Sequence, residues 1–589
     1  MNLTDDKQTK IATSAKAVAA SQNPKRPDNW RETIESIVVA FVLAFLFRTF
    51  EAEAFVIPTG SMAPTLYGQQ RDVVCTKCKT RFAVGVSSVP ANDAEIRDGR
   101  LVPAYRSNFA VCPNANCRFP NNVLDHEMFA GDRILVNKFP YEFGDPQRWD
   151  VVVFKFPEQA KTNYIKRLAG LPGEELLIEN GDVKVRPLDS DAPFFIARKH
   201  PDKQRQLQLP VHDNDHPASD LLKAGWPESW ANQGTEAWVA HVGSRSFQID
   251  GEKLDSEQQH WLRYTNYTPT AEDWMTALSG KDEHLARRAK PQLIKDFYAY
   301  NGRISVSEAE NRVARGELPE LIVNEPEQWV GDLTLHATVD LLAPRGELTL
   351  ELIKGLRRHH CRIDLQSGSA IFAYSHEDDR GEGALKDVKK PFDTGMNKPG
   401  TYKVSFTDVD DRLCLWVDDR LVEFFEFDPD DGNPDPPQNS SIAGTALDKA
   451  PAGIAARAAS LKVSHLRIER DIYYRSDFAG SHSSSKKTFR LKDDPDDRND
   501  EFMMLGDNSP RSNDSRLWQT THAVPRHLLI GKAFLIYWPH GVPFLNNGHG
   551  YAVGQYFEPL PRDGSEPNPP LPKFSIPFYP QVGRMHRIR

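Results

Sequence analysis

The chain has 589 residues and a formal net charge of −9, because 82 Asp and Glu outnumber 73 Lys and Arg. This acidic balance excludes a general nucleic-acid binder, which carries a basic face. The length predicts roughly three to four domains, and a mean hydropathy of −0.55 excludes a polytopic membrane protein. Six cysteines are too few for a disulfide-dense scaffold, and 43 prolines with 36 glycines favour sheets and loops.

One strongly apolar run, Ile37 to Phe47, follows a polar and basic leader over residues 1–33. Extended to residues 34–52, it approaches the length of about 20 residues that a helix needs to cross a bilayer. We expect an uncleaved single-pass anchor in the cell membrane, with the leader in the cytoplasm and the rest on the outer face. Two alternatives stay open: a buried core helix, and a cleavable signal peptide, because Ala52 and Ala54 form an Ala-x-Ala pattern.

The segment Ile57 to Leu66 comes soon after this run and places Ser61 in a short turn next to Gly60. A serine in such a turn is usually no more than a turn residue, so this segment alone predicts little. Three further blocks give it weight: Gly131 to Lys138, a turn that enters a strand; Tyr164 to Glu174, with Lys166 in an apolar, strand-like context; and Met504 to Arg516 far downstream.

These four blocks, in this order after an apolar span, resemble bacterial type I signal peptidases over about 200 residues. The resemblance implies a mainly β protein: an antiparallel β catalytic core behind one N-terminal transmembrane helix. It also implies a serine endopeptidase with a Ser/Lys dyad and an acyl-enzyme intermediate, in which Ser61 is the nucleophile and Lys166 the general base. No cofactor is expected for this catalysis.

The resemblance assigns supporting roles to five more residues. Ser512 matches a serine that orients the lysine amine, and Thr59 supplies an oxyanion donor where many relatives have serine. Asp514 matches an acid that pairs with arginine as structural support, and Arg516 and Arg167 are its candidate partners.

Elementary acid–base chemistry also requires that Lys166 be neutral if it is to act as the general base. A serine hydroxyl is a poor nucleophile until a base takes its proton, and a lysine with its usual pKa of about 10.4 is protonated at neutral pH. Burial disfavours the ammonium form, and the apolar neighbours of Lys166 make burial plausible.

The expected partners are preproteins that carry signal peptides cleaved after small residues, together with membrane lipid; the secretion machinery is a further candidate, and nucleic acid is excluded. The alternative from another class is an anchored carbohydrate- or partner-binding protein with a degenerate peptidase core. Ser61, Lys166 and Ser512 discriminate between the two, because a degenerate core should have lost at least one of them.

Four cysteines interrupt the first part of the core, in a zinc-ribbon-like insert over residues 72–125. Cys75 and Cys78 form one close pair, and Cys112 and Cys117 form a second about 30 residues later. Such pairs can place four thiolates around a structural Zn²⁺. Two disulfides are the alternative, since an outward location would permit them.

A much larger insertion, residues 186–497, separates the first part of the core (53–185) from the second (498–557). Residues of about 232–470 contain alternating strands such as Leu333 to Leu341, with Thr334 and His336 on the polar face. They predict a β-sandwich, and the hairpin Leu413 to Arg420 resembles concanavalin-A-like and laminin-G-type jelly rolls. Cys361 and Cys414 either face each other across it or are free thiols, and the proline-rich tail, residues 558–589, is expected to be extended or disordered.

Overall fold

In the computed structural model, the chain forms two compact units, residues 1–52 and 53–589. Unit 1 holds one helix, α1 (Asn29–Leu46), and residues 1–28 and 47–51 of the expected leader and anchor lie outside the described part. Within the residues that the structure describes, no helix is both long and apolar enough to cross a bilayer. The described residues are 29–46, 52–85, 95–97, 100–102, 109–123, 126, 128–129, 131–255, 257–280, 285–304, 311–320, 327–376, 384–388, 390–427, 445–476, 488–539, 541–543, 551–556, 571–576 and 578–588.

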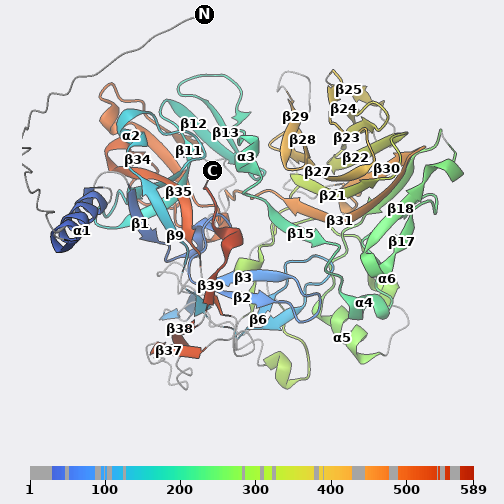
Figure 1. Cartoon of the computed structure of the whole chain (residues 1–589), viewed down its shortest axis with the longest axis horizontal. Coiled ribbons are helices and arrows are strands. Elements are labelled where there is room, and N and C mark those ends of the chain that lie inside the picture. The colour runs from blue at the N-terminus through green and yellow to red at the C-terminus, as the bar shows by residue number, and fades with distance from the viewer. Residues whose placement is uncertain are drawn as a thin grey trace, which may run out of the picture. The chain divides into compact units, whose positions relative to one another are not determined.

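A seven-stranded sheet forms the centre of the expected catalytic core (Figure 1). Its strand order is β1-β9-β35-β10-β11-β33-β34. Strand β35, from the second part of the core, therefore lies between β9 and β10, which come from the first part. The pairs from β9 to β34 are antiparallel, as expected. The strands are β1 (Ala52–Val56), β9 (Arg133–Asn137), β10 (Val151–Lys155), β11 (Asn163–Gly170), β33 (Glu501–Leu505), β34 (Val524–Pro525) and β35 (Leu529–Trp538).

Strand β10 is buried on both faces of this sheet, which explains its unbroken apolar run. Val151 and Val153 pack in one cluster with Met62 and Ile134. Val152 and Phe154 point to the opposite face and pack in a second cluster, which includes Phe502 and Trp518. The first cluster also holds Ile57 and Leu66, so the segment around Ser61 is packed against the sheet.

A smaller sheet marks where the large insertion leaves and re-enters the core. Its order is β14-β13-β12-β32, and β32, which follows the insertion, pairs with β12, which precedes it. The strands are β12 (Glu174–Glu179), β13 (Asp182–Pro187), β14 (Phe195–Ile196) and β32 (Thr488–Arg490).

The cysteine insert contributes strands to two small three-stranded sheets and forms one separate hairpin, and the third strand of the second sheet, Arg303–Ile304, comes from the large insertion. All six cysteines of the chain are free thiols in the structure. The first sheet holds β2 (Gln70–Val74), β3 (Arg81–Gly85) and β8 (Met128–Phe129); the second holds β6 (Phe109–Val111), β7 (Pro120–Asn122) and β20 (Arg303–Ile304); the hairpin is β4 (Glu95–Arg97) with β5 (Arg100–Val102).

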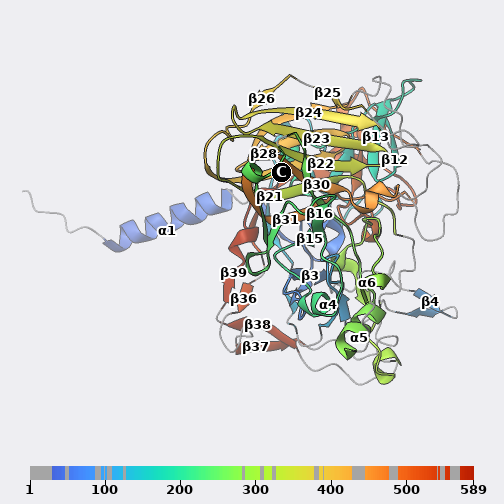
Figure 2. The ribbon, with the colours of Figure 1, turned by 90° about the vertical axis from the view of Figure 1, so that its right-hand side faces the viewer.

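Two eight-stranded sheets form the sandwich that the sequence predicts (Figures 1 and 2). They share one core, in which Leu335 and Phe406 of one sheet pack with Leu350 and Phe372 of the other. One sheet holds β15 (Leu209–Asp213), β17 (Val239–His241), β18 (Ser246–Asp250), β21 (Leu333–Leu341), β27 (Gly400–Val409), β28 (Arg412–Val417), β29 (Arg420–Glu426) and β31 (Ser460–Arg470). The other holds β16 (Trp230–Gln233), β19 (His260–Tyr264), β22 (Glu347–Lys354), β23 (Arg357–Asp364), β24 (Ser369–His376), β25 (Lys386–Asp387), β26 (Phe392–Asp393) and β30 (Ala452–Arg457).

The polar face of β21 is more buried than its alternation predicts. Thr334 and His336 are both buried, because polar neighbours cover them. The Gln208 side-chain amide donates to the Thr334 hydroxyl, and the His336 ring contacts Ser405 Oγ at 2.7 Å and a carboxylate oxygen of Glu469 at 3.0 Å. The half-exposed strand that we expected is therefore a central strand with a satisfied polar face.

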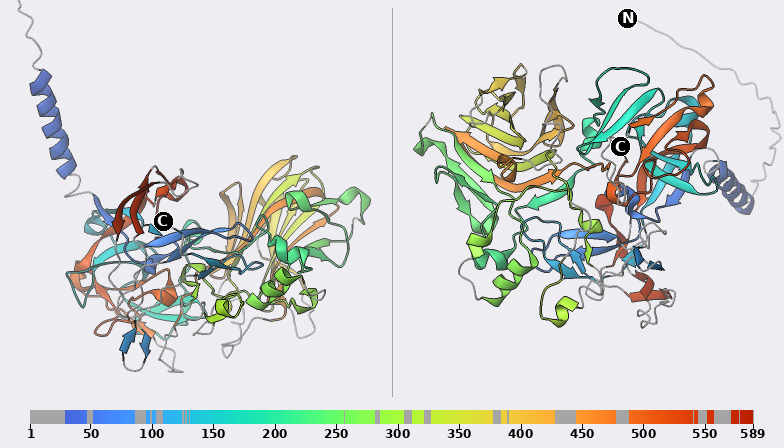
Figure 3. Two further views of the ribbon diagram at one scale, coloured as in Figure 1. Left: turned by 90° about the horizontal axis from the view of Figure 1, so that it is seen from below. Right: turned by 180° about the vertical axis from the view of Figure 1, so that it is seen from behind.

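The C-terminal region departs from the expected tail. It forms two small pairs, β36 (Gly541–Pro543) with β39 (Phe578–Pro580) and β37 (Tyr551–Tyr556) with β38 (Leu571–Ile576), which are red in Figures 2 and 3. Arg584 forms an ion pair with Asp132 at 2.7 Å, and Ile588 packs in the cluster beneath the serine turn. Residues 557–570 lie outside the described part. Further α-helices in the described residues include α2 (Pro140–Phe143), α3 (Pro201–Gln204), α4 (Ser219–Lys223), α5 (Ala271–Ser279) and α6 (Leu285–Arg288).

Candidate active site

Ser61 lies in a single turn of 3₁₀ helix, η2 (Gly60–Met62), that is held at both ends. The backbone N–H of Asn508 donates to Ser61 O at 3.1 Å, and its side-chain amide donates to Gly60 O at 3.0 Å. Gly60 is required here, because a Cβ at this position would lie 2.3 Å from the ring of Tyr300. The serine side chain itself stays partly exposed.

Lys166 lies in the middle of β11, and its Nζ is 2.9 Å from Ser61 Oγ. The side chain is buried, with an exposed fraction of 4%, and Nζ also donates to Ile165 O at 3.0 Å. Burial lowers the pKa of Lys166 to about 8, although the carboxylates of Asp514 and Asp507 oppose that shift. Roughly a tenth of the amine is therefore neutral at pH 7, and this fraction can accept a proton.

Two buried ion pairs lie in the same region, and one of them differs from expectation. Arg516 pairs with Asp514 at 2.6 Å, as one of the two expected choices. Arg167 pairs instead with Asp507, with Nε 2.7 Å from Oδ1 and both side chains almost fully buried. The register explains the correction: Arg167 lies opposite Leu505, so Asp507, two residues later, is within its reach.

Ser512 is also buried beside the serine turn. Its Oγ has no hydrogen-bond partner within the described residues. Gly506 permits its close approach, since a Cβ there would lie 2.1 Å from Ser512 Oγ and 2.6 Å from Ser61 O. Thr59 precedes η2 and makes no capping hydrogen bond with its side chain.

The large insertion contributes two residues to this site that the sequence did not indicate. Tyr300 packs against Gly60 and stacks on Tyr67, with ring centroids 5.3 Å apart. Asn301 and Asn508 exchange two side-chain hydrogen bonds, of 2.6 and 3.0 Å. Asn508 lies inside the downstream block that we singled out, but Asn301 lies more than 200 residues before it and carries no local signal.

The four clustered cysteines form a separate group with metal-site geometry. Their sulfur atoms all lie within 4.8 Å of one another. Cys75 and Cys117 are 3.7 Å apart, and Cys78 and Cys112 are 3.5 Å apart. A tetrahedral zinc ion with Zn–S bonds of about 2.3 Å requires sulfur separations of about 3.8 Å, whereas a disulfide requires about 2.05 Å. The group therefore suits a tetrahedral cation.

Comparison with known proteins finds similarity to signal peptidases. A family model described as "Signal peptidase, peptidase S26" matches residues 30–102, 110–223 and 454–538. Signal peptidase I of Helicobacter pylori is 26% identical over 230 residues, which cover 37% of this chain and 66% of that protein. Signal peptidase I of Pseudomonas aeruginosa is 37% identical over 95 residues, 13% of this chain and 34% of that protein. The probable signal peptidase I-2 of Synechocystis is 26% identical over 257 residues, 40% of this chain and 86% of that protein.

The chain thus spans less than two thirds of the length of the Helicobacter and Pseudomonas proteins. Among solved structures, a carbohydrate binding module, CBM66 from Bacillus subtilis, covers 41% of this chain and 95% of its own. Its identity of 12% and TM-score of 0.21 are too low to carry an argument about fold or ligand.

Proposed function

Because the family model of signal peptidases, peptidase S26, matches this chain and signal peptidase I proteins are similar to it, we propose that it belongs to this family and is a serine endopeptidase that removes signal peptides from exported preproteins. The observation that carries the proposal is the buried amine of Lys166, 2.9 Å from the hydroxyl of Ser61. The alternative of a degenerate core used only for binding has no observation in its favour, since Ser61, Lys166 and Ser512 are all present.

In the proposed mechanism, neutral Lys166 takes the proton of Ser61 while Oγ attacks the scissile carbonyl. The Ser61 backbone N–H and the Thr59 hydroxyl are the candidate donors to the oxyanion. Lys166 then gives the proton to the leaving amine, which leaves an acyl ester on Ser61. A water activated by the same amine hydrolyses the ester, and Ser512 is proposed to orient that amine through both steps.

We further propose that residues 34–52 anchor the enzyme in the cell membrane, with the N-terminus cytoplasmic and the catalytic unit on the outer face. Support comes from apolar side chains of α1 that are at least half exposed, Ile34, Ile37, Val38, Val39 and Phe41. Such a surface suits lipid. An anchored enzyme would meet preproteins whose signal segments lie in the same membrane, and the secretion machinery is a candidate partner.

We also propose that Cys75, Cys78, Cys112 and Cys117 hold one structural Zn²⁺. The sulfur separations support this, as does a matching backbone turn at each pair. The residue after the second cysteine of each pair has a left-handed backbone: φ is 66° at Lys79 and 50° at Arg118. Four thiolate ligands leave no open position, so the ion would stabilise the insert and take no part in catalysis.

The dyad is tested with detergent-solubilised full chain and a preprotein that carries an Ala-x-Ala site. Ser61→Ala and Lys166→Ala should each lower the cleavage rate by about 10⁴-fold or more, because nucleophile and base act as a unit. Lys155→Ala is the matched control: this lysine is exposed on the neighbouring strand β10, and its loss should change the rate less than about two-fold. Cleavage that persists in Ser61→Ala or Lys166→Ala would rule out the dyad.

A further inference from the structure

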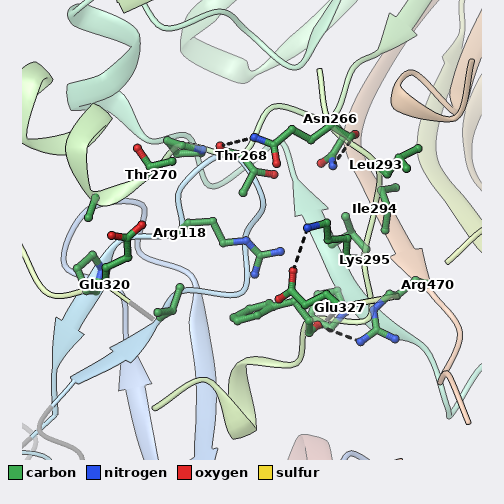
Figure 4. Close-up of a pocket in the computed structure, with 18 of the residues that line it drawn as sticks. Arg118, Asn266, Thr268, Thr270, Leu293, Ile294, Lys295, Glu320, Glu327 and Arg470 are labelled. Carbon is green, nitrogen blue, oxygen red and sulfur yellow. Dashed lines mark hydrogen bonds and ion pairs between the residues drawn. The ribbon is translucent and has the colours of Figure 1, made fainter. Parts of the chain in front are cut away.

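A cavity of about 340 Å³ lies beside the cysteine insert, away from the catalytic residues that the family resemblance identified (Figure 4). Its walls come from residues next to the second cysteine pair, from the start of β15, from the loops around residues 266–271 and 292–297, and from Pro319, Glu320 and Glu327. This volume is within the range of pockets that bind small molecules. The peptidase mechanism makes no use of it.

Arg118 supplies the charge at the centre of this cavity. Figure 4 shows its guanidinium directed into the space between Thr268 and Glu327. The group lies over the ring of Phe297, with Cζ 3.9 Å from the centroid, and one of its N–H groups is 3.5 Å from Cys112 O. Within the described residues, no carboxylate forms an ion pair with it. The backbone at Arg118 is left-handed, with a φ of 50°.

The other charged groups of the cavity already have partners. Lys295 pairs with Glu327 at 3.5 Å, and Arg312, outside the lining, pairs with Glu320 at 2.9 Å. Arg470 donates to three backbone carbonyls, those of Asp296, Phe297 and Asp471. In the described residues, Arg118 and Arg470 are thus the two lining cations without a carboxylate ion pair, and Arg470 uses its N–H groups on backbone carbonyls.

We propose that this cavity binds an organic monocarboxylate through Arg118. A guanidinium presents two parallel N–H groups that match the two oxygens of a carboxylate. A carboxylate places one negative charge near Glu320 and Glu327, whereas a phosphate dianion would place two there. Pro120, Pro269 and Leu293 line the walls, so the ligand carries an apolar body next to its carboxylate.

The carboxylate can belong to a free acid or to the C-terminus of a peptide, and both sources can be tested directly. The probes are N-acetyl-leucine and the peptide N-acetyl-Ala-Ala-Leu, each compared with its C-terminal amide by calorimetry and by ligand-detected NMR on the full chain. We expect acids to bind at least about ten-fold more tightly than their amides, because the amide cannot form a charged pair. Binding of N-acetyl-leucine indicates a free acid, and binding of the peptide alone indicates a C-terminus.

Arg118→Gln should weaken binding of the acid by about ten-fold or more. Arg345→Gln is the matched control, since this arginine is half exposed and pairs with Glu252 far from the lining residues. The comparison of acid with amide uses the unchanged chain, so it tests the proposal even if Arg118→Gln fails to fold. Equal binding of acid and amide, no binding of either acid, or unchanged binding by a folded Arg118→Gln variant would overturn the proposal.

Discussion

At the scale of single residues, the protonation of Lys166 sets the expected pH dependence of the rate. The base must be neutral, and burial places its pKa at about 8. The value of kcat/KM should therefore rise about ten-fold per pH unit below about pH 8 and level off above it. Initial rates of preprotein cleavage between about pH 6 and pH 10 measure this profile.

The control for this profile is Lys155→Ala, which should leave the midpoint unchanged because its side chain is exposed. A midpoint near pH 6.5, the usual pKa of histidine, would contradict a lysine base. A rate that falls as the pH rises through 8 would contradict it as well, since the sign of the dependence follows from loss of the ammonium proton.

The residues of the dyad could be predicted because each lies in a local motif, whereas the ion-pair partner of the neighbouring Arg167 could not. Ser61 lies beside Gly60, and Lys166 lies in an apolar strand, and both features are visible within ten residues of sequence. Asp507 replaced Asp514 as the partner of Arg167 because the choice depends on strand register. The two carboxylates are only seven positions apart, so sequence distance does not separate them.

At the scale of elements, the alternation of apolar and polar residues predicted where strands lie better than it predicted how buried their faces are. Strand β21 has the predicted bounds, Leu333–Leu341, yet its polar face is buried by Gln208 and by neighbouring strands. The folded end of the chain was missed for a similar reason. Prolines argue against regular structure locally, while the ion pair of Arg584 with Asp132 joins residues 452 positions apart.

The cysteine insert is the element whose stability should depend on metal. We expect about one zinc per chain by elemental analysis. Chelation should unfold the insert, because structural zinc sites contribute on the order of 10 kcal/mol. Trp274 reports this change: it is fully buried, its indole N–H donates to Cys117 O, and its ring lies 5.0 Å from that of Phe119. Its fluorescence should shift to longer wavelength when the chelator removes the ion.

Trp274→Phe is the matched control for this experiment, because it should remove the fluorescence shift without removing a cysteine ligand. Zinc well below one per chain would contradict the metal site, and so would a chelated protein with unchanged fluorescence. Cys78→Ser should lower the zinc content and leave Lys166 and Ser61 in place, since neither contacts the cysteine group in the described residues.

At the scale of the whole molecule, the large insertion is joined to the catalytic turn. Tyr300 packs against Gly60, and a Cβ at Gly85 of the cysteine insert would also meet its ring, at 2.4 Å. The Asn301 side chain hydrogen-bonds the Asn508 side chain, and Asn508 in turn donates hydrogen bonds to the carbonyls of Gly60 and Ser61. The insertion therefore contributes to the position of the nucleophile, although it supplies no group that touches the substrate bond in the proposed mechanism.

Asn301→Ala tests whether that contact positions Ser61. The change removes both hydrogen bonds to the Asn508 side chain, so the serine turn loses a constraint and kcat should fall about ten-fold. KM should change little, and the midpoint of the pH profile should stay near 8, because Asn301 does not contact Lys166. Asn301→Asp keeps one acceptor and should recover part of the rate. The matched control is Asn232→Ala elsewhere in the insertion, which removes three side-chain hydrogen bonds, two to the Trp238 backbone and one to the Glu236 carboxylate. Equal losses of kcat in Asn301→Ala and Asn232→Ala would show a general loss of stability and would contradict a positioning role.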